Sequence, residues 1–552
     1  MKARMISVLV IICMIAALAA CTKGNTEVKR TVPSANASPT GGTESQDAEQ
    51  WALPYKGPEV TIKIFGWESF KPIDPATDFG KWVQGKIGNI KLDFEIPPEG
   101  TAAKSDLYLA SGDVPDIMIY REPAKFMKNY GDGSRSVNLL DYARYMPEYT
   151  KRIAEYPHLT SYAKDDKTNY LFFPTWYNTT SELWYMNQDL MDKYNLKAPK
   201  NYEEMAQQME LVHKAEPDVS GLLFHGWGFE YQYIIYSMLF GSNGMNQMAV
   251  SYDHNKRQWV YPLTANNEVN LNTVKAMREA YANGSLHPDF STISTDVWTN
   301  IRNNGKWLFA NLYPFSTADQ NNTVKTKFTY MDPPAATGVN PAVRTDYESD
   351  TTGWAFIISN TAKNPELAAG LLEFFSSEEF ANTYYWGFEG VSYETAADGK
   401  KKFLDSYTQM PDADKQSKLG LTTPYTVTQF ISNFYAGDAI AASWSDETKR
   451  GVTIAAEKLK NGEFANYYGA TTPDFTDDVN EKMTVINTAV KTYVTENLTA
   501  FIIGKKPIDE WDKFIAGIQK YGDMNWVVEQ YNAAPQKPLR AKATERTWLE
   551  TK

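Results

Sequence analysis

The sequence contains little cysteine: among 552 residues, only Cys13 and Cys21 are cysteines. Cys13 lies in an apolar N-terminal segment that we expect to be cleaved off. Cys21 then has no partner for an intramolecular disulfide. An exported chain without disulfides must obtain its stability from its hydrophobic core. The length is sufficient for two or three domains.

Basic residues are also scarce, with 55 Lys and Arg against 67 Asp and Glu, a net charge of −12. Nucleic acids and anionic surfaces select clusters of Lys and Arg. The charge balance therefore argues against nucleic acid as a partner.

Motifs of catalysis are missing as well. The five histidines are scattered, with no pair at the helical spacing of a zinc protease. We find no nucleophile elbow and no phosphate-binding glycine loop. A pair of glycosidase carboxylates needs only proximity in space, so the sequence leaves that alternative open.

The N-terminus carries a targeting signal. Lys2 and Arg4 precede an apolar run at 5–18, and small residues lead into Cys21. The run is too short for a dependable membrane span, which needs roughly 20 residues. Residues 1–20 thus resemble a bacterial lipoprotein signal peptide. The resemblance implies cleavage before Cys21 and attachment of palmitate-type acyl chains, of which two or more anchor a protein stably.

Residues 21–50 comprise this lipidated cysteine and a stretch rich in Ser, Thr, Gly, Pro and Asn, without Leu, Ile or aromatics after Cys21. Such a composition cannot bury enough apolar surface to fold. We expect a flexible tether that holds the folded part at the outer face of the cell membrane.

Folded structure should begin near Trp51. Alternating apolar residues predict strands at 60–65 and 90–96, and an apolar run predicts a third at 116–120. Helical patterns lie between them, at 78–87 and 104–111, each followed by a glycine. The order of strand, helix, strand, helix, strand predicts an α/β lobe with parallel connections.

The segment 108–117 reads YLASGDVPDI, a helix end, a turn and a strand start. It resembles a signature of family 1 extracellular solute-binding proteins, the receptors that feed sugar-importing ABC transporters. Further segments resemble this family, including its large Gram-positive lipoprotein branch, in the family's order: YLFFP (170–174), WYMNQDL (184–190), LKAPKNYEEM (196–205), YANGSLHPDF (281–290), WGFEGVSYE (386–394) and FIIGK (501–505).

The resemblance implies an α/β, two-lobe periplasmic-binding-protein-like (type II) fold with a hinge and an inter-lobe cleft. The implied first lobe spans 51–177 and 351–403, and the second spans 178–350 and 404–552. We expect a monomer that is not an enzyme. It should capture a carbohydrate of the oligosaccharide class and pass it to ABC permease subunits. The alternatives are a surface lipoprotein enzyme acting on polysaccharide and a sensory or adhesive lipoprotein.

Many members of this family carry a calcium loop after the helix that here begins near Tyr202. In this chain residues 214–221 read KAEPDVSG, with too few oxygen ligands at alternating positions. Similar patterns begin at 253–255 and 412–414 and then fail. We expect no metal and no cofactor.

Aromatic residues are abundant, with 15 Trp and 34 Tyr. A sugar ring packs its C–H face on Trp or Tyr, while its hydroxyls need a few placed polar groups. Aromatics at strand ends and in loops are the best candidates, although each one alone is as compatible with a packing role, and Asp113 with turn capping. The candidate ligand contacts are Trp67, Asp113, Trp176, Tyr177, Trp227, Tyr231, Tyr313, Trp354, Trp386 and Glu389.

Overall fold

The structure is a computed structural model that describes most of the chain from residue 50 to residue 536. The positions left out within that range are 69, 156, 161, 164, 174–181, 225–227, 314–323, 345–353, 422–436, 468–471 and 474. The predicted signal peptide, Cys21 and the predicted tether up to residue 49 lie outside the described residues. Within the described part, no helix has the length and apolar character to cross a membrane.

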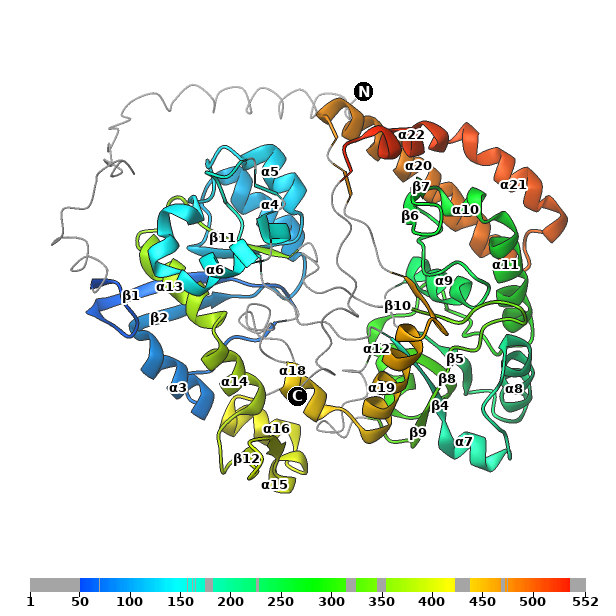
Figure 1. The fold of residues 1–552 in the computed structure, drawn as a ribbon, viewed down its shortest axis with the longest axis horizontal. Coiled ribbons are helices and arrows are strands. Elements are labelled where there is room, and N and C mark those ends of the chain that lie inside the picture. Colours follow the sequence, from blue (N-terminus) through cyan, green and yellow to red (C-terminus); the bar gives the residue numbers. More distant parts are fainter. Residues whose placement is uncertain are drawn as a thin grey trace, which may run out of the picture. The chain divides into compact units, whose positions relative to one another are not determined.

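The first sheet contains β1 (Tyr55–Phe65), β2 (Gly88–Glu95), β3 (Ile117–Tyr120) and β11 (Ala355–Ile358), in the order β11-β3-β1-β2. β1 pairs in parallel with β2 and with β3, which confirms the predicted connections. Helix α3 (Asp78–Ile87) packs beside β2 (Figure 1). Helix α4 (Thr101–Ser111) ends at Gly112, whose φ of 81° is a left-handed conformation that glycine adopts without strain.

β11 joins this sheet although it lies more than 200 residues beyond β3, because it pairs antiparallel with β3 along Ala355–Ile358. We call the elements packed on this sheet the first lobe. The remaining ones are α5 (Pro123–Tyr130), η1 (Leu139–Tyr145), α6 (Pro147–Glu155), η2 (Pro157–Thr160), α13 (Pro365–Phe375), α14 (Glu378–Trp386), β12 (Tyr393–Thr395), β13 (Lys401–Phe403), α15 (Asp405–Thr408), α16 (Asp412–Asp414), η5 (Lys415–Leu419) and α18 (Gly437–Ser443).

The second sheet contains β4 (Leu183–Asn187), β5 (Ser220–Leu223), β8 (Trp307–Leu312) and β9 (Phe328–Met331), in the order β5-β8-β4-β9. β5 and β8 are parallel, whereas β4 is antiparallel to both β8 and β9. Successive residues of β4 point to opposite faces of the sheet: Trp184 packs in the hydrophobic core on one face, and Tyr185 packs in a second core on the other face. This sheet is therefore covered on both faces, as its apolar composition requires.

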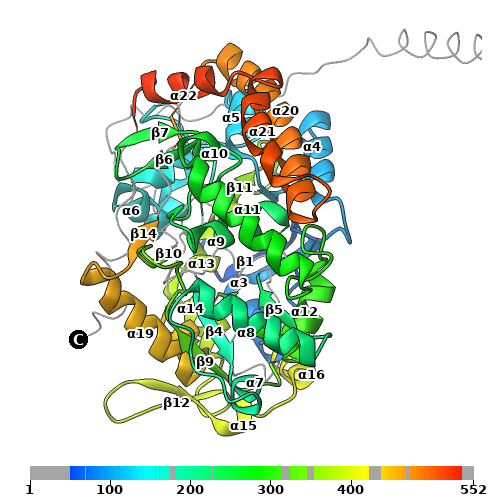
Figure 2. The same ribbon diagram turned by 90° about the vertical axis from the view of Figure 1, so that its right-hand side faces the viewer.

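We call the elements packed on the second sheet the second lobe. They are α7 (Gln188–Lys193), α8 (Tyr202–Ala215), α9 (Phe229–Met238), β6 (Ser251–Asp253), β7 (Gln258–Val260), α10 (Pro262–Ala265), α11 (Asn267–Ala282), α12 (Thr295–Asn303), β10 (Ala342–Arg344), α19 (Asp446–Lys460), β14 (Ala465–Tyr467), α20 (Asp477–Ile502), η7 (Ile508–Glu510), α21 (Trp511–Gly517), η8 (Ile518–Lys520) and α22 (Met524–Ala533). Figure 2 shows the long helix α20 beside α11, and β14 pairs with β10.

The segment after Phe403 differs from the expected division of the chain. We expected residues 404–552 in the second lobe, but Tyr407, Leu419 and Ala439 pack in the core of the first sheet. Among the described residues that follow, the first buried one in a core of the second sheet is Trp444. Tyr407 stacks on Phe403 with ring centroids 5.5 Å apart, which holds this segment on the first-lobe core.

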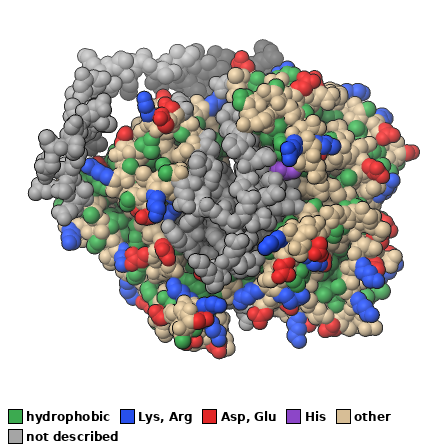
Figure 3. Space-filling model, viewed as in Figure 1, with side chains coloured by type: hydrophobic (Ala, Val, Ile, Leu, Met, Phe, Trp, Pro, Cys, Tyr) green, Lys and Arg blue, Asp and Glu red, His purple; other side chains and the backbone are tan. Residues whose placement is uncertain are grey.

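The surface carries charges of both signs. Figure 3 shows Lys and Arg side chains interspersed with Asp and Glu over the face in view. This pattern is ordinary for a globular protein and gives no extended patch of one sign on the described part of that face.

Candidate functional site

One edge of the first sheet gathers Trp67, Arg121 and Trp354. Trp67 follows β1 and Arg121 follows β3, and these two parallel strands end at the same edge. Trp354 precedes β11, which runs antiparallel to β3 with Ala355 opposite Tyr120, so it lies at that edge too. Ligands of α/β sheets bind outside the carboxyl ends of the strands. This edge is therefore the candidate site on the first lobe.

The three side chains contact one another. The ring centroids of Trp67 and Trp354 lie 4.9 Å apart, edge to face at 82°, and Phe70 stacks on Trp354 at 6.0 Å. The Arg121 Cζ lies 4.3 Å from the centroid of Trp354 and 5.1 Å from that of Trp67. Both tryptophans are half-buried. We call Trp67, Trp354 and Arg121 the aromatic platform.

The structure brings together two residues that the sequence singled out and one that it did not. Trp67 and Trp354 are sequence candidates, and their contact with a ligand stays a prediction. Arg121 was missed, although its position directly after the apolar strand 117–120 is a usable signal. Partial burial of the guanidinium lowers the pKa of Arg121 although the residue as a whole is exposed, and the negative charge of Glu68 acts in the opposite direction.

The corresponding edge of the second sheet carries Glu182 and Tyr313. Leu183 pairs with Leu312, so Glu182 before β4 and Tyr313 after β8 are at the same edge. Asn311 pairs with Trp184 on the same face of the sheet. Tyr231 on α9 belongs to the segment that follows β5, and it packs half-buried against the second-lobe core. Of the two described sequence candidates on this lobe, Tyr313 is thus at this edge, whereas Tyr231 is placed only on α9.

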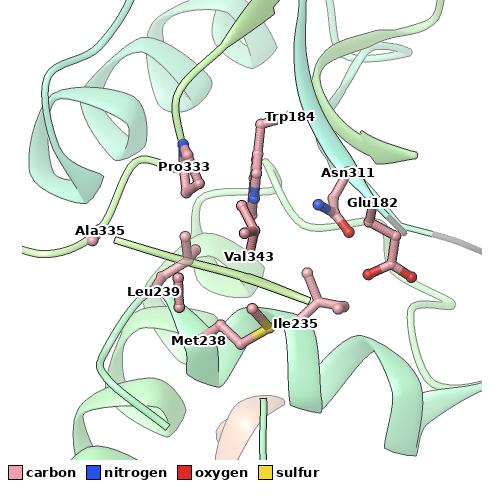
Figure 4. A pocket seen from close by; sticks show the side chains of 10 residues that line it. Glu182, Trp184, Ile235, Met238, Leu239, Asn311, Pro333, Ala335 and Val343 are labelled. Atoms are coloured by element: carbon pink, nitrogen blue, oxygen red, sulfur yellow. The ribbon is translucent and has the colours of Figure 1, made fainter. Parts of the chain in front are cut away.

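Glu182 and Asn311 line one end of a small cavity (Figure 4). Both side chains are buried, with 2% and 4% exposure, and the Asn311 Oδ1 has no hydrogen-bond partner among the described residues. The remaining lining is mostly apolar and is contributed by Trp184, Ile235, Met238, Leu239, Pro333, Ala335, Ala342 and Val343. The volume of about 10 Å³ is comparable to that of one water molecule. Sugar sites need hundreds of Å³, so this cavity as it stands is too small to hold a sugar ring.

Trp386 is buried in the first-lobe core, with 5% exposure. Its ring lies 4.7 Å from that of Phe403 and 5.7 Å from that of Tyr393. This environment favours a packing role over the ligand contact that the sequence suggested. Glu389 is exposed on the following turn, which is held by the Gly390 N–H donating to the Tyr393 carbonyl at 2.8 Å.

Asp113 lies in the exposed turn after α4, where its N–H donates to the Ser111 Oγ at 3.3 Å. The neighbouring carboxylate Asp116 accepts the Lys63 N–H at 2.8 Å and so fixes the turn to β1. Ligand contact by Asp113 stays a prediction. Trp176, Tyr177, Trp227 and the lipidation candidate Cys21 lie outside the described residues.

Carboxylates in the stretch 214–221 are paired with lysines. Glu216 bonds Lys193 at 2.7 Å, and Asp218 bonds Lys306 at 2.8 Å. These ion pairs hold the pKa of both carboxyls below the ordinary range, Glu216 with added help from the Tyr194 hydroxyl. No group of three or more potential metal-binding side chains occurs within the part of the chain that the structure describes.

The overall structure is similar to those of solved substrate-binding proteins. The alginate-binding protein AlgQ2, in a structure without calcium ion, is 18% identical with a TM-score of 0.67, covering 87% of this chain and 98% of that one. The ABC-transporter substrate-binding protein FusA from S. pneumoniae, in complex with kestose, is 17% identical with a TM-score of 0.65, covering 86% and 100%.

A third relative is an HMO-binding, ABC-transporter-associated solute-binding protein from Bifidobacterium longum infantis. It is 14% identical with a TM-score of 0.60, covering 86% of this chain and 98% of that one. At these identities the likeness shows the fold, a two-lobe periplasmic-binding-protein-like α/β fold.

The family comparison covers a continuous segment of the sequence. Residues 75–382, more than half of the chain, match the family model of the bacterial extracellular solute-binding proteins. This segment includes β2, β3 and β11 of the first sheet and all four strands of the second. The chain belongs to the bacterial extracellular solute-binding protein family.

Proposed function

We propose that this protein is a membrane-tethered extracellular receptor that binds an oligosaccharide and delivers it to an ABC importer. The observation that carries the proposal is the aromatic platform, where two half-buried tryptophans and a cation meet at the carboxyl edge of a sheet. Stacking surfaces beside polar donors are what sugar rings require. The fold is similar to that of proteins described as binding alginate or as complexed with kestose.

We place the ligand between the edges of the two sheets. Phe172 pairs with Phe356, so the chain leaves the first lobe at the edge where Trp354 lies. It begins the second sheet at Leu183, beside Leu312 and the edge of Tyr313. A ligand that contacts both edges binds a closed form better than an open one and shifts the population toward closure. Closure is the signal that a permease reads.

The test is a glycan screen on the purified domain from residue 50, followed by solution scattering. A ligand that binds only the folded state raises apparent stability by mass action, about 2.7 kcal/mol at a concentration 100 times its Kd. We expect at least one oligosaccharide to raise the melting temperature and to reduce the radius of gyration. A panel of neutral and acidic glycans without any such ligand would refute the receptor.

The same incubations address catalysis. We propose that binding occurs without bond cleavage, so the bound oligosaccharide should be recovered intact after prolonged incubation at high protein concentration. Chromatography of the glycan checks this, and shortened products would favour the polysaccharide-degrading alternative.

Lipid anchoring through Cys21 is part of the proposal. We expect Cys21→Ala to release the full chain from the membrane fraction while its affinity for glycan is unchanged, because Cys21 precedes the predicted tether in the sequence and is not one of the platform residues. Fractionation of cells expressing each form is the measurement. Retention of the variant on the membrane would contradict the anchor.

A further inference from the structure

The N–H donors of the Arg121 guanidinium have no acceptor among the described residues. It lies over the rings of Trp354 and Trp67, and the residue is exposed. Among the described residues, no carboxylate or carbonyl accepts a hydrogen bond or forms an ion pair with it. A guanidinium presents five N–H donors in a planar fork that matches a carboxylate. The rings hold the cation in place and leave this fork for a ligand.

Glu68 does not occupy the fork, because it is committed to helix α4. Its Oε2 accepts the Thr101 N–H at 2.8 Å and the Thr101 hydroxyl at 2.6 Å. The Glu68 N–H in turn donates to the Thr101 Oγ at 3.0 Å. This reciprocal pairing fixes the carboxylate at the start of the helix.

The other carboxylates near the end of β3 have partners as well. Asp106 accepts from the Tyr120 hydroxyl at 2.8 Å and pairs with Lys125 at 2.7 Å. Glu122 pairs with the same lysine at 3.1 Å. The acidic groups near Arg121 that the structure describes are thus paired elsewhere, and none of them contacts the cation directly.

A bound ligand that covers the platform removes water from this cation. An uncompensated buried charge is strongly unfavourable, whereas a bidentate carboxylate supplies the opposite charge and two hydrogen bonds. A sugar hydroxyl offers a neutral acceptor and about half of that stabilisation. The arrangement therefore suits an anionic ligand better than a neutral one.

We propose, on the basis of the receptor function above, that the ligand is an acidic oligosaccharide whose carboxylate pairs with Arg121 while a sugar ring packs on Trp67 and Trp354. Arg121 is then the residue that selects uronate-type sugars over neutral ones. The selection arises within a protein of net charge −12, so it rests on this local pair and not on the overall field.

The test uses matched probes. Trimers of galacturonate and of mannuronate are compared with their carboxyl-reduced counterparts, which keep the rings and linkages and replace each carboxylate with a hydroxymethyl group. Calorimetry on the domain from residue 50 measures each affinity. We expect an acidic trimer to bind about 10- to 100-fold more tightly than its reduced form, the value of a charge-assisted hydrogen-bonded pair.

Three variants separate the contribution of the Arg121 guanidinium fork from that of positive charge alone. Arg121→Met should abolish the preference for the acidic trimer, and Arg121→Lys, which keeps the charge without the fork, should retain part of it. Lys125→Met is the matched control, since it removes a nearby positive charge that is already paired, and it should change the preference less than about 2-fold. Thermal melting of each variant checks that the fold is intact.

The outcomes separate this proposal from the receptor function. If neutral trimers or neutral glycans of the panel bind and acidic ones do not, or if Arg121→Met leaves the preference unchanged, the acidic ligand is refuted while the receptor stands. If no glycan binds, both are refuted. Loss of binding of acidic and reduced trimers alike in Arg121→Met would assign Arg121 a purely structural role in holding the tryptophans, which also overturns the proposal.

Discussion

The two sheets present different chemistry at their corresponding edges. The first edge exposes a cation on half-buried aromatic rings, with Arg121 over Trp354 and Trp67. The second edge buries its polar groups, Glu182 and Asn311, beside a cavity of about one water molecule. Topology places both edges at strand ends, but the layer of side chains above them decides which is accessible. An open platform can recognise a ligand directly, whereas buried polar groups act only if a movement uncovers them.

The tryptophans of the first lobe repeat this contrast on a smaller scale. Trp354 is half-buried at the platform, and Trp386 is buried against Phe403. The two residues have the same chemistry and the same lobe. Their replacement should therefore separate recognition from stability.

The largest effect should come from Trp386→Ala. Truncation of a buried tryptophan costs about 3–5 kcal/mol of unfolding free energy, from lost transfer and the cavity left behind. Denaturant unfolding measures the loss, and calorimetry on the folded fraction should show ligand affinity unchanged. If the variant had wild-type stability and weakened binding, Trp386 would be a ligand contact, as the sequence suggested.

The next effect is that of Trp354→Ala on binding. Loss of an aromatic stack, together with the support it gives to Arg121, should weaken affinity for a glycan by about 1–3 kcal/mol, roughly 5- to 150-fold. Thermal stability should fall less than in Trp386→Ala because the side chain is only half-buried. Equal affinities of variant and wild type would remove the platform as the recognition surface.

At the second edge, Asn311→Leu tests whether the buried Asn311 amide lowers the free energy of unfolding. Such a cost would indicate that the amide serves the function of the protein. Because the Asn311 Oδ1 lacks a partner among the described residues, its removal should raise the unfolding free energy by about 1 kcal/mol. Asn187→Leu is the matched control on the same sheet. The Asn187 amide donates to the carbonyls of Gly305 at 2.9 Å and Trp307 at 3.0 Å, so its loss should cost about 1–3 kcal/mol.

Denaturant unfolding of both variants gives the answer. A destabilised Asn311→Leu would mean that a water molecule in the cavity pairs with the Asn311 amide. The polar groups at the second edge would then serve the fold and would not be available to a ligand.

Two carboxylates that fasten helices in the two lobes should respond oppositely to pH. Burial raises the pKa of Glu373 above 4.5, although it accepts the N–H groups of Glu148 at 2.7 Å and Tyr149 at 3.1 Å. Burial alone would also raise the pKa of Glu447, but hydrogen bonds from Arg450 and from the Tyr330 N–H hold it below 4.5.

The sign follows from linkage. Glu373 contributes most stability below its unfolded-state pKa and loses that contribution as pH rises through its folded-state pKa. Glu447 contributes above its unfolded-state pKa and loses that contribution as pH falls through its folded-state pKa. Relative to wild type, Glu373→Gln should gain melting temperature from about pH 4 to pH 7, and Glu447→Gln should gain it below about pH 4. The same pH trend in both variants would contradict this assignment.

The smallest expected effect is that of a chelator. Because Glu216 and Asp218 are paired with lysines, EDTA should leave the melting temperature of the domain unchanged. A drop of several degrees that calcium reverses would show a metal site in this protein.

Local pattern predicted the first lobe well. Alternation at 60–65 and 90–96 and the glycines at 88 and 112 fixed β1, β2, α3 and α4, because strand and helix periodicity and helix ends depend on neighbouring residues. The change of lobe after Phe403 was misplaced, since short apolar stripes do not reveal which core they join.

The sequence by itself determined the α/β element order of the first sheet and the family, because both depend on contiguous residues, and it predicts the lipoprotein-like N-terminus. Only the tertiary structure decided that Trp67, Arg121 and Trp354 meet and that Trp386 does not join them. Trp67 and Trp354 are separated by more than 280 positions in the chain. Their contact depends on the register of β11 against β3 and of β3 against β1, a long-range pairing that no local pattern encodes.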